Sequence, residues 1–537
     1  MIRRKTIFAT AAVICFGALG AALPAMASAA TEVPAWNLTI ASTPTNFPPE
    51  EELGFLGTPQ YTIIATNVGG GTATGPIELT DTLPVGVTPV SASVQTQGQG
   101  SFLFSCPISG QTVTCTNSGE PVEAGKWLFL EIAVEVANLP DPTVLTNSAT
   151  ISGGGALPVG ATTQTTVTNA LPAFDLVPGQ AGFSASLTEA DGTPSVTAGS
   201  HPYQMNVNVA TPSEQHSELI FASDGGVRDV VTTLPPGVVL NPTATAARCT
   251  EAQLETASCP EASQIGNVNV NTVAPFVGPT QSPIYSLFPP HGKGASFGFD
   301  AVLVGIYVHI NGGVRAGDYA LTSEANDILA RALNPLLTFQ VQFWGDPSGA
   351  EHDFSRGRCS YPGRSNEKCE VTRRATPLLS MPTRCADSLS ADVEVDSWGH
   401  PGEFHKNSIE FTDNGGSPTG VIGCNTEEFE PKLKARPTTT VADAPSGLEA
   451  DLEIPQSEDV NTRATAHLRK AVVTLPEGFV LNPSSANGLD GCSSAQVGID
   501  PGTGVANGNQ PSCPDASKIG SAEVETPLLD HVLPGSV

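Results

Sequence analysis

Short β-type runs separated by turn residues restrict the fold of this chain more than any other feature. Residues 61–67 are rich in Tyr, Thr and Ile and run into three glycines, and residues 77–81 alternate apolar and polar side chains. Further runs recur at the roughly 8–12-residue spacing typical of a β-sandwich; they are 102–104, 113–115, 127–136 and 145–151. The pattern predicts an all-β fold whose first Ig-like sandwich module covers residues 31–170.

The cysteines indicate how such modules are closed. Eleven cysteines are present, and all except Cys15 lie beyond the first 29 residues, in near-neighbour pairs. A zinc site would need closer ligand spacing, such as C-x2-C. We therefore predict five local disulfides in an oxidising compartment: Cys106 with Cys115, Cys249 with Cys259, Cys359 with Cys369, Cys385 with Cys424, and Cys492 with Cys513.

The N-terminus indicates export. Arg3, Arg4 and Lys5 precede an apolar run over 7–23 and a small-residue stretch over 25–29, which predicts a signal peptide at residues 1–29. No later window holds 18 consecutive apolar residues, so we expect no membrane span after its removal. The net charge of −29 disfavours nucleic acid as a partner. We expect a secreted, extracellular protein, with cell-wall association left open.

Several segments within 31–170 carry a family resemblance. They are Tyr61–Asn67, Thr72–Gly75, Asp81–Val87, the pair Cys106 and Cys115, and Thr146–Thr150. Together they resemble the Ig-like repeat family of bacterial surface proteins called domain of unknown function 11 (DUF11). The resemblance implies a cell-surface or wall-associated sandwich, and it carries no catalytic residues over to this chain.

An internal repeat organises the rest of the chain. Residues 231–242 align with 472–483, and 258–266 align with 512–520. We therefore predict a first repeat unit with a β-sandwich lobe at 175–345 and a Cys-rich β lobe at 346–435, followed by an incomplete second unit at 436–537. These units also resemble uncharacterised secreted actinobacterial repeat proteins, on the segments 343–347 with 352–353, 381–385 and 396–398.

One short helix is expected among the strands. Thr322 or Ser323 can cap it, Glu324 and Asp327 suit its first turns, and the pair Asn334–Pro335 would end it. The fold class predicted for the whole chain is thus all-β, with tandem Ig-like β-sandwich modules, local disulfides and one short helix.

Residues that look catalytic or metal-binding have simpler interpretations. Gly294–Gly298 matches G-x-S-x-G, but a strand rather than a helix should follow Ser296, so we predict no catalytic serine. We interpret Glu351-His352-Asp353, and His400 with Glu403 and His405, as loop polarity rather than metal sites. Calcium stays an alternative to ordinary turn chemistry in three oxygen-rich loops: 189–192, 346–353 and 413–415.

The sequence thus predicts a non-enzymatic, exported structural or adhesive repeat protein of the cell surface or cell wall. No cofactor is expected. A ligand-binding module of the envelope, recognising an extracellular glycan or protein, is the alternative. A secreted hydrolase ranks third.

Overall fold

The computed structural model describes residues 32–49, 58–97, 104–117, 119–216, 219–272, 279–301, 306–329, 336–360, 367–413, 416–475, 477–480 and 487–537. The predicted signal peptide, residues 1–29, lies outside these ranges. The prediction of an all-β fold is confirmed, since strands dominate these ranges and the two α-helices within them have five and four residues. Every part described below belongs to the compact unit Thr31–Val537.

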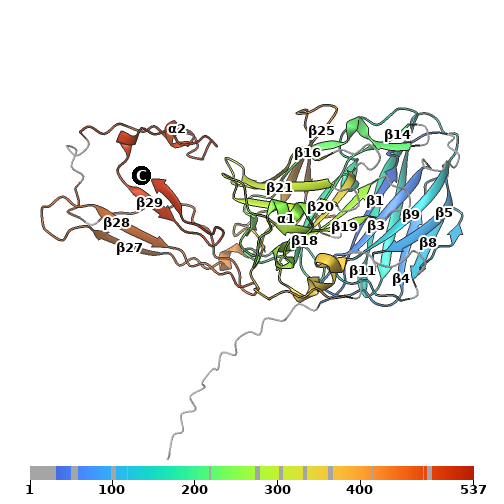
Figure 1. Cartoon of the computed structure of the whole chain (residues 1–537), viewed down its shortest axis with the longest axis horizontal. Helices are drawn as coiled ribbons and strands as arrows, with labels where there is room; N and C mark the ends of the chain where they lie inside the picture. Colours follow the sequence, from blue (N-terminus) through green and yellow to red (C-terminus); the bar gives the residue numbers. More distant parts are fainter. Residues whose placement is uncertain are drawn as a thin grey trace, which may run out of the picture. The chain divides into compact units, whose positions relative to one another are not determined.

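Two facing sheets form the first module (Figure 1). The four-stranded sheet has the order β1 (Trp36–Thr43), β3 (Gln60–Asn67), β9 (Trp127–Val136) and β5 (Val87–Thr96). The other sheet has the order β2 (Asn46–Phe47), β11 (Ala156–Val167), β10 (Thr143–Gly153), β4 (Ile77–Thr82), β8 (Thr112–Asn117) and β6 (Phe104–Ser105), and β7 (Ile108–Ser109) also pairs with β8.

Period-2 patterning explains why this module packs as a sandwich. In β4 the side chains alternate between buried and more exposed positions, which places Ile77 and Leu79 in the core. They meet Ile63 of β3 and Leu130 of β9 in one apolar cluster between the two sheets. The outer face of β3 and β9 is also buried, at Ile64, Trp127 and Phe129; the four-stranded sheet is therefore covered on both faces.

A single eleven-stranded sheet forms the second module. Its order is β12 (Phe183–Thr188), β13 (Gln204–Ala210), β23 (Leu336–Trp344), β18 (Gln264–Thr272), β19 (Thr280–Ser286), β20 (Ala295–Ala301), β21 (Ile306–Val314), β22 (Leu321–Ala325), β16 (Val227–Thr233), β25 (Ser390–Ser397) and β26 (His405–Glu410). The sheet curls so that its edge strands β12 and β26 contact each other. Strands from both predicted lobes, 175–345 and 346–435, therefore share one sheet around one apolar core.

The predicted helix after Ser323 is wrong. Leu321–Ala325 is the strand β22, which pairs with β21 on one side and β16 on the other. Backbone hydrogen bonds to two neighbouring strands outweigh a local capping signal, because intrinsic helix propensity is a weak preference. Residues 330–335, which would have held the end of that helix, lie outside the described residues. The helix of this module is instead α1 (Glu251–Glu255), which has a Thr250–Gln253 capping box.

Smaller elements complete the second module. β14 (Ser213–His216) pairs with β15 (Leu219–Ala222), and β17 (Val239–Leu240) pairs with β24 (Leu379–Ser380). Two short 3-10 helices, η4 (Ala350–Ser355) and η5 (Gly357–Ser360), lie beyond β23.

The C-terminal region forms only local elements. Two hairpins are present, β27 (Lys432–Pro437) with β28 (Leu448–Glu453) and β29 (Ser521–Val524) with β30 (Leu533–Ser536) (Figure 1). Between them lies α2 (Ser494–Val497), whose Ser493–Gln496 capping box matches that of α1. By the sequence repeat, β29 and β30 correspond to β18 and β19. The counterpart of β16, residues 468–474, forms no strand, and its side chains are largely exposed.

The first module contacts the curled sheet through buried polar groups. Gln97 donates to the Gln281 side chain at 2.6 Å, and Gln281 donates to the Gly125 carbonyl at 2.8 Å. The Lys126 ammonium donates to the Cys359 carbonyl at 3.1 Å. Because Lys126 is almost completely buried, its pKa is lowered to about 8. The two modules are thus joined by directional hydrogen bonds as well as by covered apolar surface.

Candidate functional site

A large cavity lies on the inner face of the curled sheet. Its volume is about 710 Å³, within the range of roughly 300–1,000 Å³ common for small-molecule sites. Its wall comes from β13, β16, β20, β21, β22 and β23, and most of it is apolar. Four aromatic side chains line it: Phe297, Phe299, Phe339 and Phe343.

The strand register explains why this interior is hollow. Inward-facing residues of neighbouring strands form rows, because side chains alternate between the two faces. One row holds Ala295, Gly312, Ser323 and Thr232, paired in that order across β20, β21, β22 and β16. We call these four residues the small row, because their side chains are too small to fill the space inside the curved sheet.

The next row has larger side chains and is wholly apolar. It consists of Phe297, Ile310, Ala325 and Val230 on the same four strands. The cavity therefore has an apolar end and, beside the small row, an end with hydroxyl groups. We call the second one the polar end; Thr232 and Ser323 are the hydroxyl residues of its inward row, and Lys293, Thr322 and Glu324 also line it.

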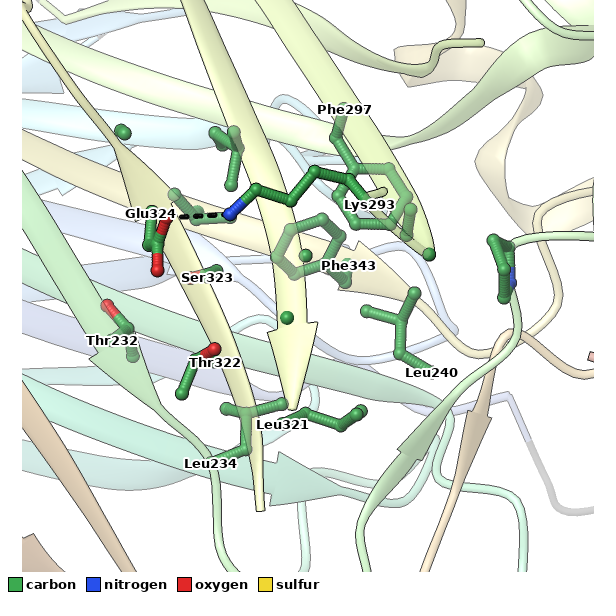
Figure 2. Close-up of a pocket in the computed structure, with 18 of the residues that line it drawn as sticks. Thr232, Leu234, Leu240, Lys293, Phe297, Leu321, Thr322, Ser323, Glu324 and Phe343 are labelled. Atoms are coloured by element: carbon green, nitrogen blue, oxygen red, sulfur yellow. Dashed lines mark hydrogen bonds and ion pairs between the residues drawn. The ribbon is translucent and has the colours of Figure 1, made fainter. Parts of the chain in front are cut away.

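One ion pair lies at the polar end. Figure 2 shows the Lys293 side chain extending to Glu324, and the Lys293 ammonium lies 3.0 Å from the Glu324 carboxylate. Both side chains are about one-third exposed. The two charges offset each other, so this wall of the cavity carries no uncompensated charge. The loop between β29 and β30 adds Thr526, Leu528 and Leu529 to the lining.

Ser296 of the G-x-S-x-G segment is not placed as a nucleophile. It lies within β20, is 4% exposed, and donates to the Asn311 side chain at 3.2 Å. No histidine is its hydrogen-bond partner in the described structure, and a strand follows it rather than a helix. The arrangement lacks the sharp strand-to-helix turn that activates a serine in hydrolases.

Glu351, His352 and Asp353 belong to a buried structural cluster. The His352 ring stacks on Trp344 with 4.3 Å between centroids, and the guanidinium of Arg356 lies 5.0 Å from the Trp344 ring. Burial holds the pKa of His352 well below its usual range, so the ring is neutral at pH 7. Asp353 instead accepts from Arg373 at 2.7 Å. These contacts lock the chain beyond β23 against the sheet.

His400, Glu403 and His405, the second group considered from the sequence, do not form one site. His400 pairs with Asp224 at 2.7 Å, and this hydrogen bond raises the pKa of His400. His405 lies 3.7 Å from Asp175 and packs edge-on against Phe174. Glu403 is exposed. His400 and His405 therefore contact different partners.

The oxygen-rich loops use their carboxylates in turns. Asp191 accepts from the Thr193 amide and hydroxyl, and Asp346 accepts from the amide and hydroxyl of Ser348. Residues 414 and 415 of the third loop lie outside the described ranges. Among the residues that the structure describes, no three His, Cys, Asp or Glu side chains are grouped to hold a metal ion.

Five disulfides are present in the structure. They join Cys106 to Cys115, Cys249 to Cys259, Cys359 to Cys369, Cys385 to Cys424, and Cys492 to Cys513. Three of them close loops with sequence separations of 9 or 10, and the longest separation is 39. In the first repeat unit they fix loops beside the sheet rather than the cavity wall.

Sequence reasoning missed the cavity. The signal was present in part, because Ala295, Gly312 and Ser323 occupy inward positions of strands that otherwise carry Phe, Ile and Val. Recognising the row required the register of β20, β21 and β22. That register could not be derived while the segment after Ser323 was interpreted as a helix.

Comparisons with known proteins find only weak structural similarity. No family model matches the chain, and no curated protein matches it. Among solved structures, the chain is similar to the major pilin subunit BcpA of Bacillus cereus, with 14% identity, 35% of this chain and 63% of that chain covered, and a TM-score of 0.21. It is also similar to the C-terminal domain of the antigen I/II polypeptide BspA of Streptococcus agalactiae, with 6% identity, 72% of this chain and 100% of that chain covered, and a TM-score of 0.19.

A third similar structure comprises domains D2 and D3 of the major pilin SpaD of Corynebacterium diphtheriae. Identity is 11%, 39% of this chain and 63% of that chain are covered, and the TM-score is 0.20. This chain thus spans less than two thirds of either pilin structure. TM-scores at this level assign neither topology nor function. Among the described residues, no helix is long and apolar enough to cross a membrane.

Proposed function

We propose that this chain is an exported, non-enzymatic structural or adhesive protein of the cell surface or cell wall. The observation that carries the proposal is the way the modules are joined. The first sandwich buries its outer face at Trp127 and Phe129 and hydrogen-bonds to the curled sheet through Gln281. Local disulfides additionally close loops in both modules. Such a construction transmits force and displays loops at fixed positions.

The sequence resemblance to DUF11 repeats supports the same proposal for residues 31–170. The β1–β11 sandwich and its Cys106–Cys115 disulfide agree with what that resemblance implies. The second repeat unit at 436–537 is proposed to belong to the same kind of module as 175–435, because α2 and the β29–β30 hairpin match α1 and the β18–β19 hairpin.

Exposure on intact cells tests the proposal. In the organism that encodes the chain, we expect an antibody against residues 31–170 to label unpermeabilised cells, and external protease to remove the label. Recovery of the protein in the cytoplasm with free thiols would contradict export. For a structural role, deletion of the gene should change cell-surface attachment or envelope strength, and complementation with Ser296→Ala should restore it fully. Failure of Ser296→Ala to complement, with the variant folded and exported, would favour a hydrolase.

A further inference from the structure

We propose that the cavity of the curled sheet is a binding site for an uncharged single-chain amphiphile, with an acyl chain and a hydroxyl-bearing head group such as a glycerol. This inference goes beyond the proposed structural role and does not depend on it. It rests on the shape, lining and charge of the cavity.

The interior suits an apolar chain. The wall away from the small row is formed by Val207, Val341 and Phe339 together with Phe297 and Phe299, and none of these side chains has a polar atom. An apolar ligand that covers this largely apolar wall removes hydrocarbon surface from water, which favours binding. The cavity is therefore matched to hydrocarbon rather than to a sugar ring or a peptide backbone.

The polar end suits a hydroxyl-bearing head group. Thr232 and Ser323, which pair across β16 and β22, place hydroxyls at this end. A hydroxyl both donates and accepts, so a glycerol-type head can exchange its hydrogen bonds to water for hydrogen bonds to this wall. A ligand head without hydroxyls would leave these wall groups without hydrogen-bond partners, which selects for amphiphiles that carry hydroxyls.

The charges disfavour an ionic head group. Lys293 and Glu324 neutralise each other at 3.0 Å, so a carboxylate ligand would have to displace Glu324, and a cationic ligand would have to displace Lys293. The chain as a whole has a net charge of −29, which additionally repels anionic amphiphiles. An uncharged head group can bind without breaking the ion pair between Lys293 and Glu324.

Binding is measured with 1-N-phenylnaphthylamine, an uncharged probe that fluoresces in apolar sites. The purified chain should bind it saturably at one site. 1-Monomyristoylglycerol should displace the probe at concentrations at least tenfold lower than myristate or tetradecyltrimethylammonium, all below micelle formation. No saturable binding by the folded chain would overturn the proposal of a site. Equal or better displacement by myristate would overturn the uncharged head group.

Two variants locate the site. Ser323→Leu and Ala295→Leu each add a side chain at the small row and should weaken probe binding at least tenfold, whereas Ser408→Leu on the exposed strand β26 should leave it unchanged. Circular dichroism and the melting temperature establish that each variant is folded. If both cavity variants fold and bind the probe as the parent chain does, the ligand is not in this cavity.

Two further variants test the head-group assignment. Thr232→Val keeps the side-chain shape and removes a hydroxyl, so it should weaken displacement by monomyristoylglycerol severalfold without changing probe affinity. Glu324→Gln leaves Lys293 without its partner and should bring myristate to within about threefold of monomyristoylglycerol. If selectivity is unchanged in both folded variants, the polar end does not recognise the head group.

Discussion

The buried carboxyl group of Asp81 makes the stability of the first module depend on pH. Its side chain is fully buried in β4, and Asn147 donates to one carboxylate oxygen at 3.0 Å. Burial raises the pKa of Asp81 to about 7, and the hydrogen bond from Asn147 only partly opposes this. The folded module therefore holds a proton at pH 5 that the unfolded chain has largely released.

We predict that Asp81→Asn removes a pH dependence of stability. Since the folded pKa lies above the unfolded one, Asp81 makes the module less stable as pH rises from about 4 to about 7. A shift of about 3 pKa units corresponds to a change on the order of 4 kcal/mol over that window. Urea unfolding at pH 5 and pH 8 measures this change. The free energy of unfolding of the parent chain should fall between pH 5 and pH 8 by more than that of the variant.

The exposed Glu78→Gln on the same strand is the matched control and should follow the parent chain at both pH values. An Asp81→Asn variant that is less stable than the parent at pH 8 would show that the ionised carboxylate is stabilising there.

At the scale of elements, partners decide which repeated segments become strands. Residues 227–233 form β16 because β22 and β25 flank them. The aligned residues 468–474 have nearly the same apolar pattern but no strand neighbours, and Val472 is 76% exposed. Hairpins and capped helical turns recur in both copies because they need only local contacts, as in β29 with β30 and in α2.

Hydrogen exchange tests this difference. We predict strong amide protection for Val231 and Thr232 and little protection for the aligned Val472 and Val473, because only the first pair belongs to a strand hydrogen-bonded on both edges. Mass spectrometry of peptides from the whole chain provides the comparison. Equal protection of the two pairs would show that the second copy completes its own sheet.

The disulfide pattern is a second prediction at this scale. Peptide mapping without reduction should recover the five near-neighbour pairs, and each local loop should add roughly 2–4 kcal/mol to the stability of its module. Any pair between Cys106 or Cys115 and a cysteine beyond residue 240 would contradict the modular construction.

The sequence predicted the strand-rich fold, the first sandwich and the repeat, because period-2 patterns and turn residues are local signals. It could also have found Asp81, since Ile77, Leu79 and Asp81 share the inward face of β4. It could not supply the pairing of β22 with β16 across some 90 intervening residues, on which the small row and hence the cavity depend. Long-range register is decided by packing and not by local propensity.

At the scale of the whole molecule, the buried contact between the two modules couples their stabilities. Gln97 and Lys126 lose their hydrogen-bonded partners when the modules are separated. We predict that the fragment 171–435 still unfolds cooperatively, because its core is its own. It should melt several degrees below the same region in the whole chain, since each lost kcal/mol lowers the midpoint by roughly 2–4 °C.

Calorimetry of the fragment and of the whole chain measures the difference, and addition of separate 31–170 should recover part of it. Aggregation of the fragment at all temperatures would show that the two regions form one folding unit rather than two.

The disulfide between Cys385 and Cys424 has a consequence for a chain held under tension. The strands β25 and β26 lie between these cysteines, and β26 is the outermost strand of the curled sheet. When the two ends of the chain are pulled, the force passes through the disulfide. The segment between the two cysteines, with a sequence separation of 39, therefore cannot extend. Its contour length, roughly 130–140 Å, stays hidden until the disulfide is reduced. The edge strand β26 is thereby protected from being pulled away from β25, and the redox state of one disulfide determines how far the chain can extend.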